Sequence, residues 1–450
     1  MDEIEELGMT RQPRLFKSEP DANRSGFSEW GTFKDSLRAP IHNWFTYPAG
    51  FSHKAVEHYL QLHSAVPQKT VIYDPFMGSG TTNIVAKLGG FSSFGVEAHP
   101  FVYPITLSKL TWDIDLASIR RFVSNLDTTA DRLSESKIRE HNAKKFPELL
   151  TKCFLPNTLY ELGAIRDKVK KSKLGANEKR LVNVALICSL RDVSIAATGW
   201  PYIAPKKIKV TSMSKLPIPT IAKRITRMLE DIEWAIEETA TLNSEHHCIL
   251  GDSRDSGVSS EIADLIFTSP PYLNNFDYAD RTRLEMYFMG DAQTWGDIST
   301  QVRTRLMTSA TTQINRSDPQ YEISAEFRSD CAEEATFISE AASELGKRRL
   351  TKGGKKSYDL MVVGYFNDIH RILRDSARIL KTGGSAAFVL GDSAPYGVHI
   401  PTDVLIGKIG TQVGMSEYLI EPLRKRGDKW ANNPQRHGVE LRETIVHFRK

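Results

Sequence analysis

The chain has 450 residues, more than one domain usually holds, so we expect one large α/β unit with substantial insertions, or two domains. Apolar residues make up 40% and charged residues 25%, which is typical of a globular protein and argues against extensive disorder. The formal net charge of +4 is too small to indicate a nucleic-acid partner by itself.

The N-terminus, MDEIEELGMT, is acidic and lacks the apolar segment of a signal peptide, and no later stretch is apolar over the length needed to cross a bilayer. We therefore expect a cytoplasmic protein without membrane contact. The four cysteines stand far apart, with no CxxC pair and no Cys/His cluster at zinc-finger spacing, so we expect no bound metal and no disulfide framework.

The first two segments are a polar N-terminal extension, residues 1–40, and a part with α/β signals, residues 41–115. In the second, the run VIYDPF from Val71 predicts a strand, GSG a tight turn, and TTNIVAKL a helix. FSSFGVEAHP then predicts a second strand whose end carries Glu97. Together these elements predict a compact βαβ unit.

Residues 116–245 change to long amphipathic segments, with helices predicted over 158–171, 177–197 and 220–240. Between them lies GWPYIAPKKIKVTSMSKLPIP, which is rich in proline and in basic residues. This pattern indicates a helical insertion into the α/β unit.

The α/β signals return in residues 246–296, where CILGDSRD and ADLIFTSPPY each predict a strand. Residues 297–358 are a second polar interruption that ends in a basic loop. In residues 359–450, YFNDIHRILRDSARIL predicts a helix ended by Gly383 and Gly384, SAAFVLGDS a central strand, and ETIVHFRK the last strand.

The glycine-rich turn after the first strand indicates a ligand site. A helix that begins there presents free backbone N–H groups and the positive end of its dipole, and glycine lets a ligand approach the main chain. Asp74 can accept a hydrogen bond from a ligand ammonium, Glu97 can bridge two ribose hydroxyls, and Asp252 can reach an adenine amino group. An amino-acid head, a ribose and an adenine together describe S-adenosylmethionine. A dinucleotide fingerprint would need glycine where Asn83 stands, and a P-loop would need GK[ST].

Two motifs then resemble one family. DPFMGSGTT is similar to the cofactor motif of the amino-methylating DNA methyltransferases, and TSPPY resembles their catalytic motif in the Ser form frequent among cytosine-N4 enzymes. YPAGFSHKAVEHYL resembles the segment that packs over the methionine end of the cofactor, with Phe51 at its aromatic position, although Tyr47 and Ser52 replace the usual His and Pro. The resemblance covers residues 42–110, 246–290 and 361–400.

The resemblance implies a Rossmann-like methyltransferase fold, in which helices flank a mostly parallel seven-stranded sheet. It also implies double-stranded DNA as the substrate and, as a further partner, a cognate restriction endonuclease. The residues expected around S-adenosylmethionine are Phe51, Asp74, Pro75, Phe76, Gly78, Gly80, Thr81, Thr82, Glu97, Asp252 and Ser253.

The catalytic motif suits methylation of a base amino group, whose nitrogen is a poor nucleophile because its lone pair is delocalised into the ring. Acceptors at the amino hydrogens draw that pair out, and the family uses the positions of Ser269 and Pro270 for this. Pro271 fixes the turn. Tyr272 would stack on the flipped base, and we expect it to be exposed because an aromatic after two prolines at a strand end is hard to bury.

Other chemistries fit less well. Carbon-5 methylation needs a cysteine that follows a proline, and here the cysteines follow Lys152, Ile187, His247 and Asp330. No GxSxG elbow surrounds Ser269, which argues against a hydrolase. Ser in the first motif position favours cytosine N4. Adenine N6 stays open, because the cofactor motif precedes the catalytic one whereas many cytosine-N4 enzymes have the reverse order. RNA guanine N2 and a non-catalytic nucleic-acid-binding role also stay open.

Recognition of DNA needs basic contacts outside the pocket. We expect the helical insertion to supply most of the recognition, with Lys206 and Lys207 at the DNA, and the basic loop near 347–356 to clamp the phosphates. The residues of this loop are Lys347, Arg348, Arg349, Lys355 and Lys356. Alternatively, the helices cover the sheet or form a dimer interface, and the sequence leaves the oligomeric state open.

Overall fold

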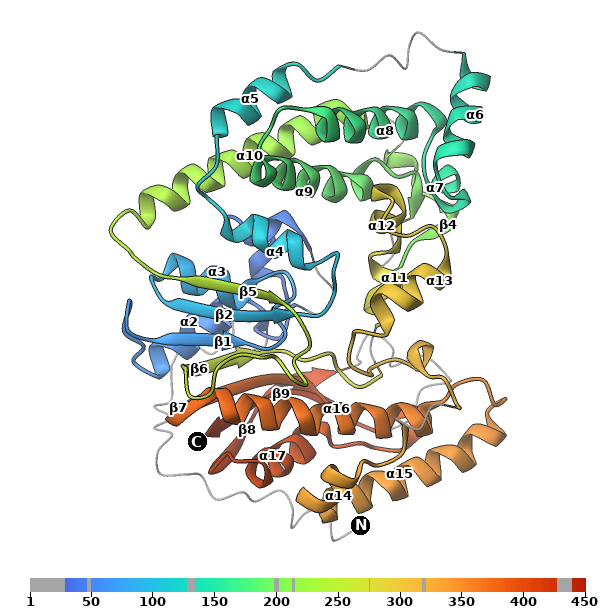
Figure 1. Ribbon diagram of the computed structural model, residues 1–450. Helices are drawn as coiled ribbons and strands as arrows, with labels where there is room; N and C mark the ends of the chain where they lie inside the picture. Colours follow the sequence, from blue (N-terminus) through green and yellow to red (C-terminus); the bar gives the residue numbers. More distant parts are fainter. Residues whose placement is uncertain are drawn as a thin grey trace.

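The structure is a computed structural model that describes residues 29–46, 50–127, 134–197, 202–212, 215–274, 276–317, 321–426 and 439–450. Most of the N-terminal extension, Tyr47 and the Gly199–Pro201 part of the basic stretch lie outside these ranges. A central sheet carries helices on both faces, and a further layer of helices stacks on one side (Figure 1). Among the described helices none is long and apolar enough to span a membrane.

The sheet has seven strands: β1 (Val71–Asp74), β2 (Ser92–Glu97), β5 (His246–Leu250), β6 (Ala263–Thr268), β7 (Leu380–Gly391), β8 (Glu417–Arg426) and β9 (Leu441–Arg449). Their order is β5-β2-β1-β6-β7-β9-β8, and of these seven strands β9 runs in the direction opposite to the other six. The parallel part has the 3-2-1-4-5 order of a doubly wound Rossmann sheet, and the order reverses between β1 and β6. The predicted fold class is therefore confirmed.

Alternation along the strands builds two separate cores. Ile72, Phe267 and Val389 face one side of the sheet, where α2 (His53–Leu62) and α3 (Thr81–Leu88) cover them. Tyr73 and Phe388 face the other side, against α16 (Tyr358–Ile379) and α17 (Thr402–Gln412). Because both faces are covered, β1, β6 and the second half of β7 are mostly apolar.

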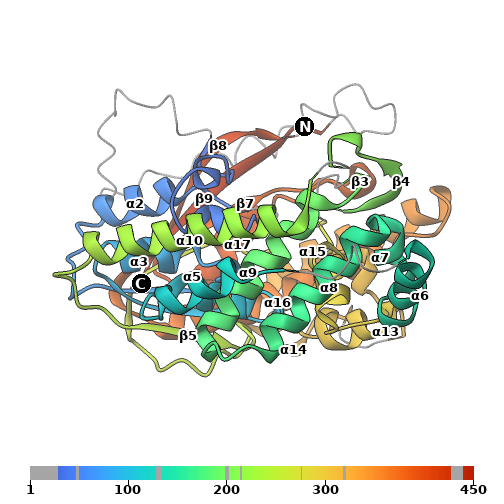
Figure 2. The same cartoon turned by 90° about the horizontal axis from the view of Figure 1, so that it is seen from above.

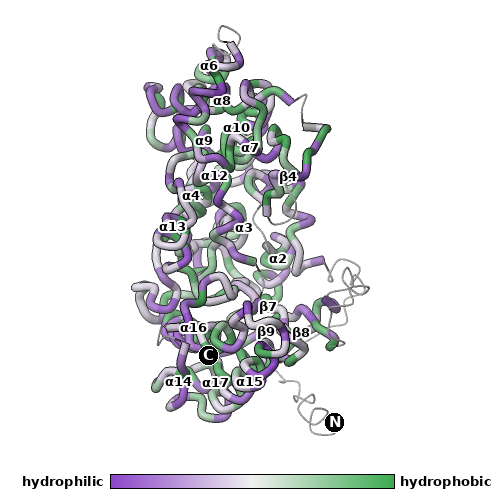
Figure 3. The backbone as a smooth tube through the Cα atoms, turned by 90° about the vertical axis from the view of Figure 1, so that its right-hand side faces the viewer, coloured by the Kyte–Doolittle hydropathy of each residue, from purple (hydrophilic) through white to green (hydrophobic). Residues whose placement is uncertain are grey.

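The predicted insertion is a helical layer. It contains α5 (Leu116–Ser124), α6 (Glu135–Lys145), α7 (Glu148–Cys153), α8 (Pro156–Lys171), α9 (Ala176–Val193) and α10 (Pro217–Glu238). The layer packs on α4 (Tyr103–Leu110) (Figure 1), and the two share one continuous apolar core. In Figure 3, α6 is hydrophilic over most of its length, which agrees with the burial of only Ile138 and Asn142.

Three predictions about elements were wrong. The predicted helix 177–197 ends at Val193, because the chain turns there into a two-stranded ribbon of β3 (Ala196–Ala197) and β4 (Ala204–Ile208). The helix expected to end at Gly383 ends at Ile379, and β7 begins at the next residue, since the strand must start early enough to pair with β6.

The third error concerns the basic loop predicted near 347–356, because its first residues belong to a helix. The polar interruption, residues 297–358, follows the short helices α11 (Tyr278–Arg281) and α12 (Arg283–Met289), begins within α13 (Trp295–Ile298), and contains α14 (Ala325–Asp330) and α15 (Ala332–Thr351). Apolar residues of α15 pack on α16, and they are too widely spaced among Glu, Ser and Arg to stand out in the sequence. Lys347, Arg348 and Arg349 thus lie on the last turns of a helix.

Candidate active site

The glycine-rich turn and the Pro-Pro turn open into one cavity. It encloses about 870 Å³ of unfilled space, part of it open to solvent, and Gly78, Ser79, Ser269 and Pro271 all line it. The cavity lies beyond the carboxyl ends of β1 and β6, where the strand order reverses and where doubly wound sheets bind their ligands. Two segments almost two hundred residues apart thus meet at one place.

Asp74 joins the two motifs directly. Its Oδ1 accepts hydrogen bonds from Thr268 Oγ1 at 2.6 Å and from the backbone N–H of Phe76 at 2.9 Å. The side chain is 1% exposed, and Oδ2 is buried with no hydrogen-bond partner among the described residues. Burial raises the pKa of Asp74 to about 6, although the bond from Thr268 opposes that rise. An unsatisfied carboxylate oxygen of this kind suits a cationic ligand group.

Glu97, at the end of β2, is the second buried carboxylate of the site, and it lines the cavity. Its Oε1 accepts a hydrogen bond from the backbone N–H of His99 at 2.7 Å. Burial raises the pKa of Glu97 to about 7, backbone donors oppose the rise, and the nearby charge of Asp74 adds to it. Two carboxylates held close together at this cost are typical of a functional site.

The glycine-rich turn is supported from behind. Gly78 and Gly80 have positive φ angles of +52° and +87°, which favour glycine. A Cβ on Gly80 would lie 2.6 Å from Thr106 Cγ2, so Gly80 is needed for packing and does not line the cavity. Lys109, which the sequence did not single out, is buried beneath the turn and donates from Nζ to the carbonyl of Ser79 at 3.1 Å. Burial lowers the pKa of Lys109 to about 7.

Most of the predicted cofactor residues line the cavity, namely Phe51, Pro75, Phe76, Gly78, Thr81, Glu97, Asp252 and Ser253. Asp74, Gly80 and Thr82 lie behind the wall. Thr82 is buried and donates from Oγ1 to the carbonyl of Phe267 at 3.1 Å, which fastens α3 to β6. The carboxylate of Asp252 pairs with Arg254 at 2.7 Å, and Ser253 Oγ donates to the carbonyl of Pro75.

Tyr278 lines the cavity as well. Another part of the wall comes from residues that the sequence did not indicate, namely Arg305, Leu306, Met307 and Ser309, which all lie in the polar interruption. Gln313 holds this segment, because its Oε1 accepts from the backbone N–H of Ser309 at 2.9 Å. No local motif marks such a segment, since its place depends on how α15 and α16 pack.

Ser269 is oriented as an acceptor. Its Oγ donates to the carbonyl of Val389, on the neighbouring strand β7, at 3.1 Å. A hydroxyl has one hydrogen and two lone pairs, so this bond leaves the lone pairs for an incoming donor. Ser269 lines the cavity, whereas Pro270 is buried beneath it and fixes the turn.

The expectation that Tyr272 is hard to bury was wrong, because it is 4% exposed. Its hydroxyl donates to Glu443 Oε1 at 2.9 Å, while Glu443 Oε2 accepts from Arg424 Nε at 2.6 Å. Burial raises the pKa of Tyr272, and the charge of Glu443 adds to that rise. The covering groups come from β8 and β9, and β8 was not predicted as a strand. Tyr272 therefore does not line the cavity in this state.

The predicted DNA-binding residues fall into two groups. Lys206 and Lys207 are exposed on β4, which lies at the periphery of the helical layer (Figure 2). Lys347, Lys355 and Lys356 are exposed at and after the end of α15. Arg348 instead makes contacts within the protein, to Glu344 at 2.7 Å and to the carbonyl of Tyr396 at 3.0 Å, and Arg349 is half-buried.

Comparisons with known proteins agree with this geometry. Residues 18–108 match the model of a family described as DNA methylase. The type II methyltransferase M.BsoBI of Geobacillus stearothermophilus is 24% identical over 93% of this chain and 87% of its own length. M.AvaI of Nostoc sp. is 22% identical over 92% and 86%. Among solved structures, the rRNA methyltransferase AviRa of Streptomyces viridochromogenes is 11% identical and covers 92% of each chain at a TM-score of 0.29, too low to establish a common fold.

Proposed function

Because the chain belongs to the amino-methylating DNA methyltransferases, we propose that it transfers a methyl group from S-adenosylmethionine to the exocyclic amino nitrogen of a base flipped out of double-stranded DNA, with cytosine N4 as the preferred target. One observation carries the proposal: the glycine-rich turn and the Pro-Pro turn line the same cavity. A methyl donor held by the first turn can there meet an amino group held by the second.

The residues present fit the cofactor. Asp74 Oδ2 is a buried acceptor without a partner, which suits the ammonium of the methionine part, and Glu97 lines the cavity where two ribose hydroxyls would need an acceptor. Gly78 lets a carboxylate approach the N–H groups at the start of α3. When bound, S-adenosylmethionine supplies a methyl group on a positively charged sulfur.

Ser269 and Pro270 act on the base. The lone pairs of Ser269 Oγ and the carbonyl of Pro270 accept hydrogen bonds from the two amino hydrogens, which localises the nitrogen lone pair toward the methyl group. The nitrogen becomes positive as the N–C bond forms, and the same acceptors stabilise this charge. Neither acceptor is basic enough to keep the proton of the methylated amine, so the proton is released to water at the open side of the cavity.

The choice of cytosine rests on Ser269 in the first motif position, as in the cytosine-N4 enzymes that this motif resembles. Adenine N6 is the alternative target, and guanine N2 of RNA is the more distant one. M.BsoBI and M.AvaI are named type II methyltransferases, so we further propose a cytoplasmic enzyme that works beside a restriction endonuclease.

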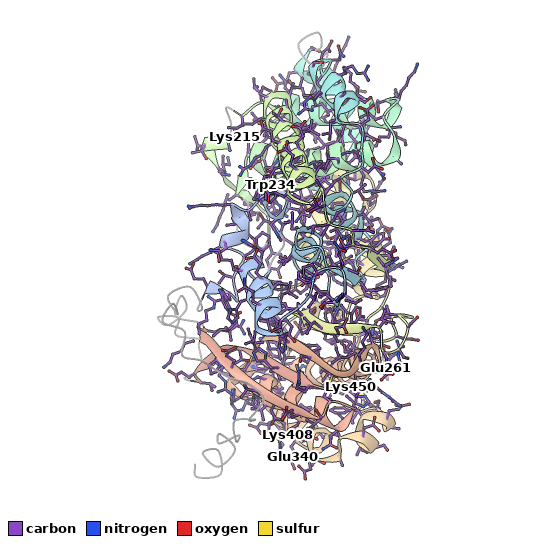
Figure 4. All side chains as sticks on the ribbon, turned by 90° about the vertical axis from the view of Figure 1, so that its left-hand side faces the viewer. Lys215, Trp234, Glu261, Glu340, Lys408 and Lys450 are labelled. Atoms are coloured by element: carbon purple, nitrogen blue, oxygen red, sulfur yellow. The ribbon has the colours of Figure 1, made fainter. Side chains whose placement is uncertain are left out.

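The β3–β4 ribbon is the proposed reader of the DNA sequence, since a two-stranded ribbon fits the major groove. The chain has no Asp or Glu between Asp192 and Glu230, whereas Lys206, Lys207, Lys209, Lys215, Lys223, Arg224 and Arg227 fall in that interval. Ile208 and Val210 are 66% and 72% exposed, which is unusual unless a partner covers them. Figure 4 shows Lys215 on the outer side of the same layer.

The ribbon is tied to the active site. The hydroxyl of Tyr202, just before β4, accepts from the backbone N–H of Asp277 at 3.1 Å, and Asp277 is followed by the cavity residue Tyr278. A contact made by the ribbon is thereby held at a fixed distance from the base pocket. Lys347, Lys355 and Lys356 are proposed to hold the phosphates from the α15 side.

The test is to express the protein in cells that lack other DNA methylation and to sequence their DNA with a method that separates N4-methylcytosine from N6-methyladenine. We expect N4-methylcytosine at one short sequence. Methyl groups in tRNA but not in duplex DNA would reject the proposal. N6-methyladenine would reject only the choice of base.

Ser269→Ala tests the catalytic assignment. Loss of one preorganised contact to the transition state lowers the rate about 100-fold, while cofactor affinity stays unchanged. Ser385→Ala is the control, because Ser385 carries the same hydroxyl on the adjacent strand β7 and does not line the cavity. Full methylation by Ser269→Ala would refute the role of this hydroxyl.

A further inference from the structure

One face of the Tyr272 ring is covered by a planar cation. The guanidinium carbon of Arg426, at the end of β8, lies 5.0 Å from the ring centroid, and its Nη1 donates to the carbonyl of Asp392 at 3.0 Å. Gly391 makes room for this contact, because a Cβ there would stand 2.3 Å from Arg426 Nη1 and 2.9 Å from Tyr272 Cδ2. Three strand ends thus build one stacked pair.

This Arg426–Tyr272 stack lies beside the cavity. Tyr278 lines the cavity, and although burial raises the pKa of its hydroxyl, the positive charge of Arg426 is near enough to oppose that rise. Ser269, which also lines the cavity, precedes Tyr272 by three residues. A base whose amino group reaches Ser269 and whose ring stacks on Tyr272 must enter the space next to Arg426.

We propose that Arg426 occupies, in the free enzyme, the place on Tyr272 where the flipped base stacks, and that the base has to displace it. The inference rests on the proposed function and adds a specificity-determining residue to it. A guanidinium is flat and delocalised and stacks on an aromatic face much as a base does. Tyr272 is therefore kept covered until a base arrives with enough binding energy to replace the cation.

Arg426 thereby raises the threshold for productive binding. Only DNA whose other contacts offset the loss of the Arg426–Tyr272 stack and of the bond to Asp392 places a base against Ser269. Removing the guanidinium should lower that threshold for every base that fits, so it should strengthen binding and weaken discrimination between targets.

The experiment measures the affinity of Arg426→Ala for a duplex that carries the methylated sequence, with the target base mispaired so that its extrusion is easy. The matched control is Lys425→Ala, which removes the same charge from the next residue of β8. Lys425 is 72% exposed and pairs with Glu440, just before β9, at 2.6 Å.

We expect Arg426→Ala to bind this duplex with a dissociation constant about tenfold below that of Lys425→Ala, the ratio that loss of a desolvated cation–π contact would give. Equal affinities, or weaker binding by Arg426→Ala, would overturn the proposal. Arg426→Gln, which keeps length and planarity without charge, provides the same test if the alanine variant does not fold. Absence of DNA methylation by the unaltered protein would instead reject the proposed function.

Discussion

The two turns that meet at the cavity differ in how far they are already arranged to bind a ligand. The turn from Asp74 to Thr81 lines an open cavity with Gly78, Ser79 and Thr81, and Lys109 supports it from below. The turn from Ser269 to Tyr272 presents one oriented hydroxyl, but its aromatic ring is buried under Arg426. The turn proposed to bind the cofactor thus already lines an open cavity, whereas the turn proposed to bind the base would have to expose Tyr272 first.

The largest expected effect comes from a change in the glycine-rich turn. Asp74→Asn removes the negative charge proposed to hold the cofactor ammonium, so we expect S-adenosylmethionine affinity measured by calorimetry to fall about 100-fold, as for a lost charge-assisted bond. The same change should raise the free energy of unfolding at pH 8 by about 2–3 kcal/mol, because a buried carboxylate whose pKa is about 6 is ionised there at a cost.

The control for this variant is Asp264→Asn, at the other end of the same pair of strands. Asp264 Oδ2 accepts from the backbone N–H of Val71 at 2.8 Å and has no part in the cavity. We expect it to lose stability and to bind the cofactor normally. If both variants bind the cofactor equally well, Asp74 is a structural link between β1 and β6 and the cofactor side is less specialised than we propose.

In the Pro-Pro turn, Tyr272→Ala and Tyr272→Phe should separate two roles of Tyr272, which are stacking of its ring on the base and the hydrogen bond of its hydroxyl. Loss of the ring removes base stacking worth about 1–3 kcal/mol, so the KM for DNA should rise about 10- to 100-fold for the alanine variant while cofactor affinity is unchanged. Tyr272→Phe keeps the ring and loses only the bond to Glu443. It should lower the free energy of unfolding by about 1 kcal/mol and change KM less than tenfold. Equal KM values for the two variants would show that the ring does not hold the base.

The pH dependence should also distinguish the two sides. Protonation of Glu97, with a pKa of about 7, and of Asp74, with a pKa of about 6, removes the charges that face the cofactor, so its affinity should fall about tenfold between pH 8 and pH 5.5. The folded state takes up these protons at a higher pH than the unfolded state, so their contribution to stability rises as the pH falls from 7 to 4. The stability gain of Asp74→Asn should therefore vanish near pH 4 in thermal unfolding.

The sequence predicted those features of the two turns that depend on residues close together in the chain. DPFMGSGTT and TSPPY each combine a strand end, a turn and a polar side chain within a few residues, and the strands β1 and β6 follow from apolar runs. Helices α8, α9 and α10 were predicted because their apolar spacing persists over several turns, and their predicted bounds were close to those observed except at the C-terminal end of α9.

What the sequence could not predict depends on distant packing. The burial of Tyr272 needs Glu443 and Arg426, more than 150 residues away, and the segment around Met307 reaches the cavity only because α15 and α16 position it. The hydrogen bond between Thr268 and Asp74 could not be predicted either, because each residue belongs to its own motif and neither motif indicates a contact with the other.

The smallest expected effect concerns the lysines of the β3–β4 ribbon, which are proposed to contact the DNA. Lys206→Ala combined with Lys207→Ala should weaken DNA binding several-fold and reduce the slope of log affinity against log salt by about 2, because each phosphate contact contributes roughly 0.9. The double variant Lys170→Ala with Lys171→Ala is the matched control. Those lysines end α8, which starts next to α7, a neighbour of β4, and extends for 16 residues, about 24 Å, so they should be too far to contact the same duplex. An identical slope in both double variants would show that the ribbon does not contact the phosphates. The DNA contacts would then have to lie near the end of α15. In that case the double variant Lys355→Ala with Lys356→Ala should reduce the salt slope instead.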